Sequence, residues 1–249
     1  MSMVLTPQYR TQRHKNSIFM MEELYTGTWT STIPNYEGYT LSFTTPPQVG
    51  QLIVLTTHSR NYNVVGGVGP IPLIGGEPFL LAARGGTYGA ISPGVRSYMT
   101  EIWYRTATAA DAANSYTVYF WADGVNMLSA TKFSGGTYWG TPEDPYVVPN
   151  STYANSVAGG ASTITAGATG VDVETGGFVI AAGARFESTA TPTVNNSFSL
   201  TSQSYSVASF GAFHVARRDN YDAAASAQNT TFTYSGNDYM ASAIAAFNP

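Results

Sequence analysis

The feature that most constrains the fold is a pattern of three strands that occurs twice in the chain. Residues 98–133 read YMTEIWYRTATAADAANSYTVYFWADGVNMLSATKF, an aromatic strand ending in arginine, a polar connector, and two more strands separated by Asp-Gly. Residues 209–247 repeat this order, with a strand at 230–234, a turn at 235–237, and a closing strand that again ends in phenylalanine. Two copies are too few for a solenoid, so they predict two halves of one sandwich, each burying the other's apolar face.

Period-two alternation predicts further strands outside these copies. Residues 39–45, YTLSFTT, alternate apolar and polar side chains and end at two prolines, while residues 51–56, QLIVLT, form a continuous apolar run that is typical of a central strand covered on both faces. Residues 162–165 and 177–183 repeat this pair, which extends the duplication to half-repeats at about 26–135 and 160–249. The predicted fold is all-β, a single antiparallel, jelly-roll-like sandwich with internal pseudo-duplication.

The N-terminal region has a different character. Residues 1–15 form a polar arm, and residues 16–25, NSIFMMEELY, place Ile18, Met21 and Tyr25 at helical spacing behind a capping Asn16 or Ser17. We therefore expect an extended arm and a short helix over residues 1–25, followed by the sandwich domain over residues 26–249. The arm either lies along its own sandwich or reaches onto a neighbouring subunit, and the second alternative is favoured because such a polar segment does not order alone.

Two long segments rich in glycine, proline and small polar residues interrupt the strands. Residues 61–96 are predicted to be loop, with one short strand at 79–83, and residues 134–161 form a second excursion. Long loops in compact domains are commonly functional or face a partner. The glycines at 66, 67 and 69 lack the spacing, lysine and helix of a phosphate cradle, so they are interpreted as turn residues.

Composition excludes several classes of function. Charged residues make up 10% of the chain, against about 25% in typical domains, and the net charge of −4 does not favour nucleic acid as a partner. The absence of cysteine excludes disulfides and thiolate metal sites. No apolar run reaches the roughly 18 residues of a membrane span, and the first residues lack the apolar core of a signal peptide. Release by lysis, within a virus particle, would be consistent with these observations.

No catalytic or metal-binding motif stands out. His14, His58 and His214 have no ligand spacing and are interpreted as solvated or core histidines. A carboxylate pair for glycan cleavage would have to form from spatial neighbours among Glu101, Asp123, Asp172 and Glu174, and ordinary turn and edge carboxylates are preferred. Asp172 with Glu174, or Asp219 with Asp222, could bind Ca²⁺ through oxygen ligands, but no EF-hand loop is present. We predict no cofactor and no metal.

Aromatic residues make up 13% of the chain, with 17 tyrosines. In the predicted strand at 116–121, Tyr119 and Trp121 share the face opposite Tyr116, Val118 and Phe120, which is unusual for a surface facing water. Such residues either stack on sugars or form protein interfaces, and the interface is favoured. Three Asn-x-Ser/Thr matches, at Asn150, Asn195 and Asn229, are attributed to chance in a chain this rich in these residues.

The order of these segments has a counterpart among known proteins. Six segments carry the resemblance, in this order: QVGQLIVLTTHS, FLLAARGG, EIWYRTATAADAANSYTVYFWADGVNMLSATKFSG, ASTITAG, GGFVIAAGA and the terminal YMASAIAAFNP. Together they resemble a loose group of Gly/Ala/Ser-rich β-sandwich virion proteins of tailed bacteriophages, found among head-decoration and tail-accessory components. The resemblance covers roughly residues 40–249 and excludes residues 1–15 and 61–96. Its motifs are compositional and positional rather than catalytic.

The resemblance implies a virion location and a non-enzymatic role. The leading hypothesis is a capsid decoration or cement protein that contacts the major capsid protein or tail proteins as a symmetric homo-oligomer, with a trimer favoured. Contact with the shell is assigned to residues of the N-terminal region: Tyr9, Arg10, Arg13, Ile18, Phe19 and Met20. Tyr119 and Trp121 are assigned to contacts within the oligomer. The alternative is a tail or fibre adhesin that binds host-surface glycans through Tyr138 and Trp139, and a glycan-cleaving enzyme is the weakest hypothesis.

Overall fold

The computed structural model describes residues 20–30, 36–61, 73–74, 77–87, 97–112, 115–121, 124–138, 154–167, 169, 172–185, 188–201, 205–207, 211–219, 221 and 223–249. In this part of the chain the fold is all-β, and the only helix is the single 3-10 turn η1 (Ala109–Ala112). Two antiparallel sheets dominate, in agreement with the predicted β-sandwich. No helix among the described residues is long and apolar enough to cross a membrane.

The first sheet contains five strands in the described residues, in the order β1-β9-β3-β7-β6. Their bounds are Met20–Thr30 for β1, Gly124–Phe133 for β9, Leu52–Asn61 for β3, Ser97–Thr106 for β7 and Leu80–Thr87 for β6. Two small two-stranded sheets accompany it: β2 (Tyr36–Ser42) with β8 (Ser115–Trp121), and β4 (Leu73–Ile74) with β5 (Glu77–Pro78). The central position of β3 confirms the prediction made from its continuous apolar run.

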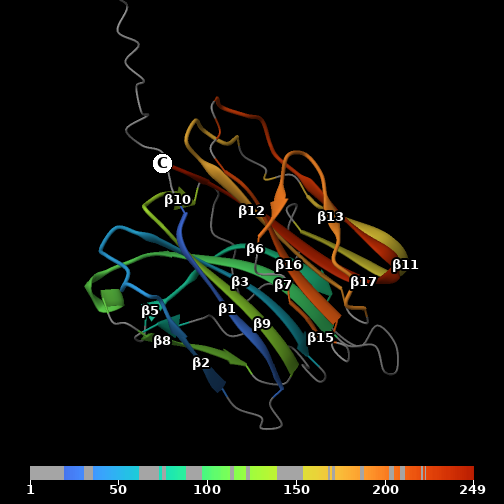
Figure 1. The fold of residues 1–249 in the computed structure, drawn as a ribbon, viewed down its shortest axis with the longest axis horizontal. Coiled ribbons are helices and arrows are strands. Elements are labelled where there is room, and N and C mark those ends of the chain that lie inside the picture. The colour runs from blue at the N-terminus through green and yellow to red at the C-terminus, as the bar shows by residue number, and fades with distance from the viewer. Residues whose placement is uncertain are drawn as a thin grey trace, which may run out of the picture.

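The second sheet contains eight strands in the described residues, of which β10-β17-β12-β16-β14 form the main path. β11 and β13 pair with β17, and β15 pairs with β16. The bounds are Thr137–Tyr138 for β10, Ala154–Ala166 for β11, Phe178–Arg185 for β12, Thr193–Val194 for β13, Ser199–Leu200 for β14, Tyr205–Val207 for β15, Gly211–Arg218 for β16 and Thr230–Asn248 for β17. Figure 1 shows the two sheets as separate layers, the first mainly blue to green and the second mainly orange to red.

Apolar side chains fill the space between the sheets and also cover both outer faces. Leu52, Val54 and Ile102 of the first sheet share one cluster with Ile180 and Val215 of the second. Because successive side chains in a strand point to opposite faces, the alternate residues form two further clusters. One contains Ile53, Leu55 and Trp103, and the other contains Val179, Ala181 and Phe232. Among the described residues, the centres of both sheets are therefore buried on both faces, and residues 52–55 of β3 and 178–182 of β12 are apolar without alternation.

The central strands of the two sheets have equivalent neighbours in an equivalent register. β3 lies between β9 and β7, and its first residue, Leu52, is opposite Phe133 at the end of β9. β12 lies between β17 and β16, and its first residue, Phe178, is opposite Phe247 near the end of β17. These phenylalanines, Phe133 and Phe247, are the two that end the repeated sequence pattern.

The turns that precede the central strands also agree. The amide of Gly50 donates to the carbonyl oxygen of Ala107 at 2.9 Å, and the amide of Gly176 donates to the carbonyl oxygen of Tyr221 at 2.8 Å. Gly50 and Gly176 have φ angles of 90° and 85°, a region that glycine adopts without the steric cost of a Cβ. The same turn geometry thus leads the chain into each central strand.

The predicted helix is wrong where the structure describes it. Met20–Thr30 is strand β1, which pairs antiparallel with β9 from Met20 opposite Phe133 to Thr30 opposite Val125. A helix of two turns has little stability of its own, whereas the edge of β9 offers a row of main-chain partners. β1 also crosses the predicted boundary at residues 25 and 26, so residues 20–25 belong to the sandwich. Residues 16–19 lie outside the described part.

Several predicted turns and loops also differ. The predicted turn at 235–237 does not separate two strands, because β17 continues through Gly236, whose φ of 89° bends the strand. Its first part pairs with the end of β11, and its second part pairs with β12 and the start of β11. Within the predicted excursions the structure also contains β4, β5, β10 and the first half of β11, and β6 is longer than the predicted strand at 79–83.

Candidate binding site

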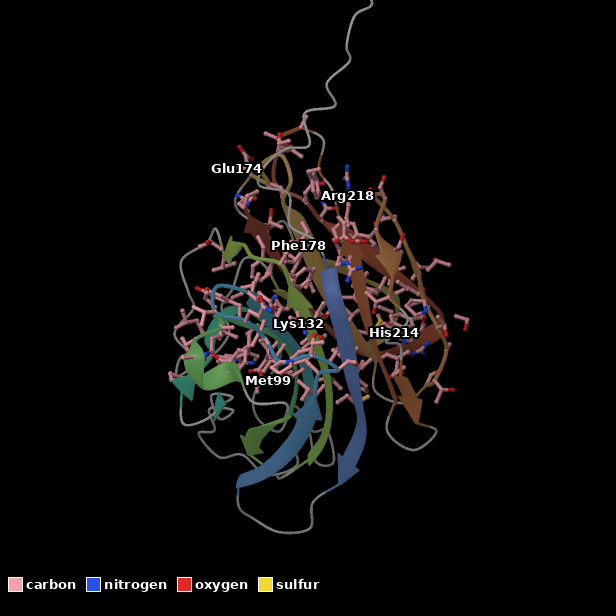
Figure 2. All side chains as sticks on the ribbon, turned by 60° about the vertical axis from the view of Figure 1, so that its left-hand side comes forward. Met99, Lys132, Glu174, Phe178, His214 and Arg218 are labelled. Carbon is pink, nitrogen blue, oxygen red and sulfur yellow. The ribbon has the colours of Figure 1, made fainter. Side chains whose placement is uncertain are left out.

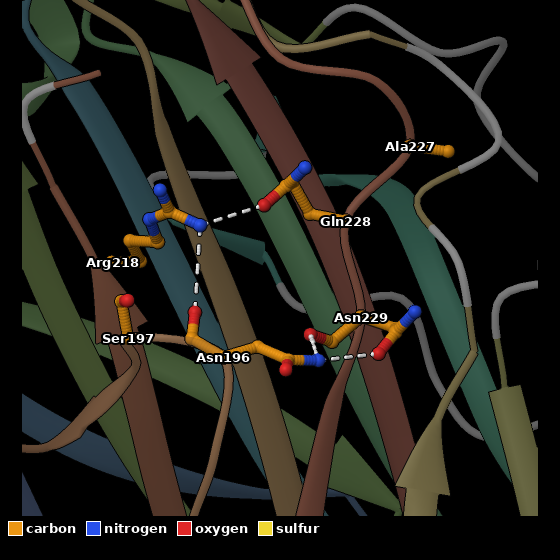
Figure 3. A pocket seen from close by; sticks show the side chains of 6 residues that line it. All are labelled: Asn196, Ser197, Arg218, Ala227, Gln228 and Asn229. Atoms are coloured by element: carbon orange, nitrogen blue, oxygen red, sulfur yellow. Dashed lines mark hydrogen bonds between the residues drawn. The ribbon is translucent and has the colours of Figure 1, made fainter. Parts of the chain in front are cut away.

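A polar pocket of about 280 Å³ lies on the second sheet, lined by Asn196, Ser197, Arg218, Ala227, Gln228 and Asn229 (Figure 3). Three parts of the chain contribute these residues. Arg218 is the last residue of β16, Asn196 and Ser197 form the turn between β13 and β14, and residues 227–229 precede β17. Figure 2 shows Arg218 at the same end of the molecule as Glu174, away from His214.

The turn beneath the pocket has an unusual backbone. Asn196 and Ser197 have φ angles of 54° and 62°, which few residues other than glycine adopt, although asparagine is among those that tolerate this region best. The side chain of Asn195 holds the turn against β17 by accepting a hydrogen bond from the amide of Thr231 at 2.8 Å. The side-chain amide of Asn196 donates to the Oδ1 of Asn229 at 2.7 Å and to its carbonyl oxygen at 3.0 Å. These bonds fix two walls of the pocket relative to each other.

Arg218 is held by neutral acceptors and by an aromatic ring. Its Nη1 donates to the Oε1 of Gln228 at 2.9 Å and to the carbonyl oxygen of Asn196 at 3.4 Å. The guanidinium carbon lies 4.5 Å from the centre of the Tyr221 ring, a cation–π distance. The hydroxyl of Tyr221 donates to the same Gln228 oxygen at 3.2 Å, so these three side chains support one another.

The charge of Arg218 is not balanced by a carboxylate among the lining residues, which are otherwise neutral. The nearest acidic residue in sequence, Asp219, accepts a hydrogen bond from the Nε of Arg217 at 2.8 Å and forms an ion pair with that residue. Burial raises the pKa of Tyr221 to about 12; the positive charge of Arg218 lowers it and Asp219 raises it further. Tyr221 is therefore neutral, and the pocket carries a net positive charge.

The buried acidic residues described by the structure are engaged in ion pairs. Glu101 accepts hydrogen bonds from the Nε of Arg84 at 2.6 Å, the Nε1 of Trp103 at 3.0 Å and the Oγ1 of Thr57 at 3.1 Å. Of the predicted carboxylates, Glu101 is thus a buried ion-pair residue rather than an edge residue. Asp172 and Glu174 are exposed, and Asp123 lies outside the described residues.

Two further ion pairs are buried, one between residues six positions apart and one between residues 53 positions apart. The Nη2 of Arg105 donates to the Oδ2 of Asp111 at 3.0 Å, and the Nε of Arg185 donates to the Oδ2 of Asp238 at 3.1 Å. Arg185 also lies over the ring of Tyr234, with 4.8 Å between the guanidinium carbon and the ring centre. Charges that leave water need such partners, because an unpaired buried charge is far more costly than a paired one.

The histidines described by the structure are core residues, which confirms that interpretation for His58 and His214. His58 lies against Phe213, with 6.3 Å between ring centres, and its Nδ1 is 2.9 Å from the carbonyl oxygen of Met99. His214 lies against Tyr234 at 5.8 Å, and burial lowers its pKa to about 4. Among the described residues, no group of three His, Asp or Glu side chains is arranged to hold a metal ion. Asp222 lies outside them.

The residues assigned to interfaces from the sequence lie largely outside the described part of the chain. Met20 starts β1, and Tyr119 and Trp121 lie on β8, where only the backbone is described. Tyr138, assigned to glycan contact, is instead in the core, where its hydroxyl donates to the carbonyl oxygen of Ala82 at 2.8 Å. A ring in this position packs against Tyr104 rather than a sugar. The residues outside the described part are Tyr9, Arg10, Arg13, Ile18, Phe19 and Trp139.

Sequence reasoning did not identify the pocket. The only signal near it was the pair of Asn-x-Ser/Thr matches at Asn195 and Asn229, which were attributed to chance. The structure brings these two segments together, with Asn195 bonded to Thr231 and Asn196 bonded to Asn229. Arg218 stood only at the end of a predicted strand, and nothing in its neighbours along the chain indicated a pocket.

Comparison of the chain with protein-family models, with curated proteins and with solved structures found no significant match. The fold and the site therefore define the class of this protein by themselves. It is an all-β protein of two antiparallel sheets, with a positively charged polar pocket at the end of β16.

Proposed function

We propose that this chain is a non-enzymatic virion structural protein of a tailed bacteriophage, a capsid decoration or cement protein that contacts other virion proteins. The observation that carries the proposal is the nested pairing of the first strands with the later ones. β1 pairs with β9, β2 with β8, and β3 with β7. Such wrapping of the chain is typical of jelly rolls, which are common in viral capsid proteins and in lectins.

An internal duplication of a jelly-roll-like unit is part of this proposal. In the second half of the chain, β11 and β17 are long strands, and each corresponds to two strands of the first half. The end of β11 pairs with the start of β17, as β2 pairs with β8, and the start of β11 pairs with the second part of β17, as β1 pairs with β9. β12 and β16 pair as β3 and β7 do. A doubled unit of this kind presents two similar outer surfaces on one chain, which suits a protein that bridges repeated subunits of a shell.

Charge and burial favour a structural rather than a catalytic role. Fold alone does not determine function, but Glu101, Asp111 and Asp238 are each bound to an arginine, which suits them to structural ion pairs. A surface with few charges also suits extensive contact with other proteins, since charged residues are depleted at the centres of interfaces.

The binding mechanism in this proposal is the burial of surface area. Residues of the arm, together with Tyr119 and Trp121 on β8, contact the shell and neighbouring copies in a symmetric homo-oligomer, with a trimer favoured. Apolar contact contributes about 25 cal/mol per Å² before the cost of ordering the arm is subtracted.

The proposal is tested with particles of the virus that carries this gene. Purified particles are examined for the chain by mass spectrometry, and particles lacking it are then incubated with the full chain or with a variant that lacks residues 1–15. We expect the full chain to bind and the deletion to reduce occupancy by at least about tenfold, the factor that corresponds to 1.4 kcal/mol.

A matched variant separates the chemistry of the arm from its length. Replacing Arg10 and Arg13 with glutamine keeps all residues of the arm but removes two positive charges. Partial loss of binding would show that the positive charges of the arm contribute part of its binding energy. Absence of the chain from purified particles would overturn the virion role, and equal occupancy by the deletion variant would overturn the role of the arm.

A further inference from the structure

We propose that the pocket around Arg218 binds a carboxylate-bearing saccharide. The inference rests on one juxtaposition: an arginine without a carboxylate partner stands in a hollow lined by amide and hydroxyl side chains from two separate loops (Figure 3). It goes beyond the proposed virion role and does not depend on it, because the pocket belongs to the chain wherever the protein acts.

The charge of the pocket favours an anionic ligand. Arg218 is partly buried at the end of β16, and the described groups that contact it are neutral: Gln228, Asn196 and the face of Tyr221. Among the described residues, no carboxylate lies within ion-pair distance of Arg218, and Asp219 is occupied by Arg217. An anionic group that entered the pocket would thus meet a positioned positive charge and would not have to displace a protein carboxylate.

Several hydrogen-bond donors of the pocket remain for a ligand. Nη1 of Arg218 is used by Gln228 and Asn196, and the guanidinium also interacts with Tyr221, so part of its set of five N–H donors remains for a ligand. The hydroxyl of Ser197 and the side-chain NH₂ of Asn229 also have no partner among the described residues, because the bonds between Asn196 and Asn229 use the oxygens of Asn229 as acceptors. These groups lie around the same hollow and can bind the oxygens of a ligand.

The lining groups and the volume of the pocket select the class of ligand. A guanidinium group forms a planar fork that matches a carboxylate with two parallel hydrogen bonds. A single arginine, with no lysine among the lining residues, balances one negative charge better than the two of a phosphate monoester. The amides and the hydroxyl suit the hydroxyl groups of a sugar, and the volume of about 280 Å³ is near the lower end for small-ligand pockets, ~300 Å³.

The pocket is also held in shape before any ligand arrives. Asn195 ties the turn to β17, and Asn196 ties it to Asn229. The amide of Gln228 donates to the Oγ1 of Thr169 at 3.0 Å, and the amide of Thr169 donates to the carbonyl oxygen of Gln228 at 2.9 Å. A preformed site loses less conformational freedom on binding, which favours affinity for a small ligand.

The test is isothermal titration calorimetry of the full chain with glucuronate, with glucose and glucose 6-phosphate as separate titrants. We expect glucuronate to bind at least about tenfold more tightly than glucose, the factor for a hydrogen bond to a charged group. We expect it also to bind more tightly than glucose 6-phosphate. Equal binding of glucose and glucuronate, tighter binding of the phosphate, or no binding of glucuronate would each overturn the proposal.

Three variants assign the effect to the pocket. Arg218→Gln should weaken glucuronate binding by at least about tenfold, and Arg218→Lys should weaken it less, because the charge remains but the planar fork is lost. Ala227→Trp keeps Arg218 and fills the hollow from an exposed position, so it should also weaken binding. Unchanged binding in Arg218→Gln or in Ala227→Trp would contradict the site.

The matched control is Arg217→Gln. It removes the same charge from the adjacent residue, whose side chain points to the opposite face of β16 and pairs with Asp219. Glucuronate affinity should stay within about twofold of that of the unmodified chain, well short of the tenfold loss expected for Arg218→Gln. A loss equal to that in Arg218→Gln would show that only general charge attracts the ligand and would overturn the pocket assignment. Thermal unfolding of each variant verifies that the compared proteins are folded.

Discussion

Phe133 and Phe178 stack across the interface between the two sheets, with 4.0 Å between ring centres and an angle of 17° between ring planes. Phe133 ends β9 in the first sheet, and Phe178 begins β12 in the second. Phe178 also stacks on Phe247 at 4.9 Å. The three rings are buried and join the ends of three strands, so they hold the two sheets together at one point.

Truncating the middle ring of this stack should be costly. We expect Phe178→Ala to lower the free energy of unfolding by about 3–5 kcal/mol, because both neighbouring rings lose contacts and a cavity remains. Phe178→Leu should cost less. The control is Leu80→Ala at a side chain that is 48% exposed, where the change should stay within about 1 kcal/mol. Urea unfolding followed by tryptophan fluorescence measures these differences, and equal midpoints for Phe178→Ala and Leu80→Ala would contradict the role of the stack.

The buried pair of Arg84 and Glu101 should show strong coupling. Arg84→Met leaves Glu101 with hydrogen bonds from Trp103 and Thr57 but without its positive partner, and we expect a loss of about 3–5 kcal/mol in stability. Adding Glu101→Gln removes the unpaired charge while keeping an acceptor, so the double variant should be more stable than Arg84→Met alone. A double-mutant cycle in urea measures the coupling, and additive losses would refute it.

His214 should make the protein sensitive to acid. Burial lowers its pKa to about 4 in the folded state; the nearby Arg185 also lowers it, while the backbone of Ala190 acts in the opposite direction. The unfolded chain has a histidine pKa near 6.5. The unfolded state therefore binds the proton more readily, and the stabilising contribution of neutral His214 is complete above about pH 6.5 and is lost as the pH falls towards 4.

The loss of stability caused by protonation of His214 has an expected size and a matched variant. The difference between the two pKa values corresponds to about 3 kcal/mol. His214→Leu removes the titrating group and fills a similar volume. The stability of the variant measured by urea unfolding should therefore fall less between pH 6.5 and pH 4 than that of the unmodified chain. Parallel pH profiles would contradict this assignment.

Gly183 in β12 should not accept a larger side chain. A Cβ at this position would lie 2.8 Å from ring carbons of Phe232, which is buried in the outer cluster of the second sheet. We expect Gly183→Ala to cost about 1–3 kcal/mol through overpacking. Gly135→Ala is the matched control, since its Cβ would meet only one backbone oxygen at 4.0 Å. Thermal unfolding compares the two, and equal melting temperatures would show that the ring of Phe232 moves aside without cost.

Local sequence patterns were sufficient to predict those strands whose formation depends mainly on their own residues. The continuous apolar run of β3 predicted a central strand, and alternation together with proline and glycine punctuation predicted most of the remaining strands of the sandwich. The prediction was wrong for residues 20–25, because their helical spacing could not reveal that β9 has an open edge at which a strand gains hydrogen bonds. Similarly, nothing along the chain indicated that Tyr138 is buried in the core and that its hydroxyl donates a hydrogen bond to the carbonyl oxygen of Ala82.

The sequence by itself determined the all-β class and the positions of the central strands, because burial and β propensity act over a few neighbouring residues. The tertiary structure alone decided which charged residues of the described part form ion pairs. Arg84 and Glu101 are 17 residues apart and Arg185 and Asp238 are 53 residues apart, yet each pair is bonded. Arg218 meets only neutral groups from two distant loops. Electrostatic interactions depend on distances in space, and those distances exist only after the sheets have assembled.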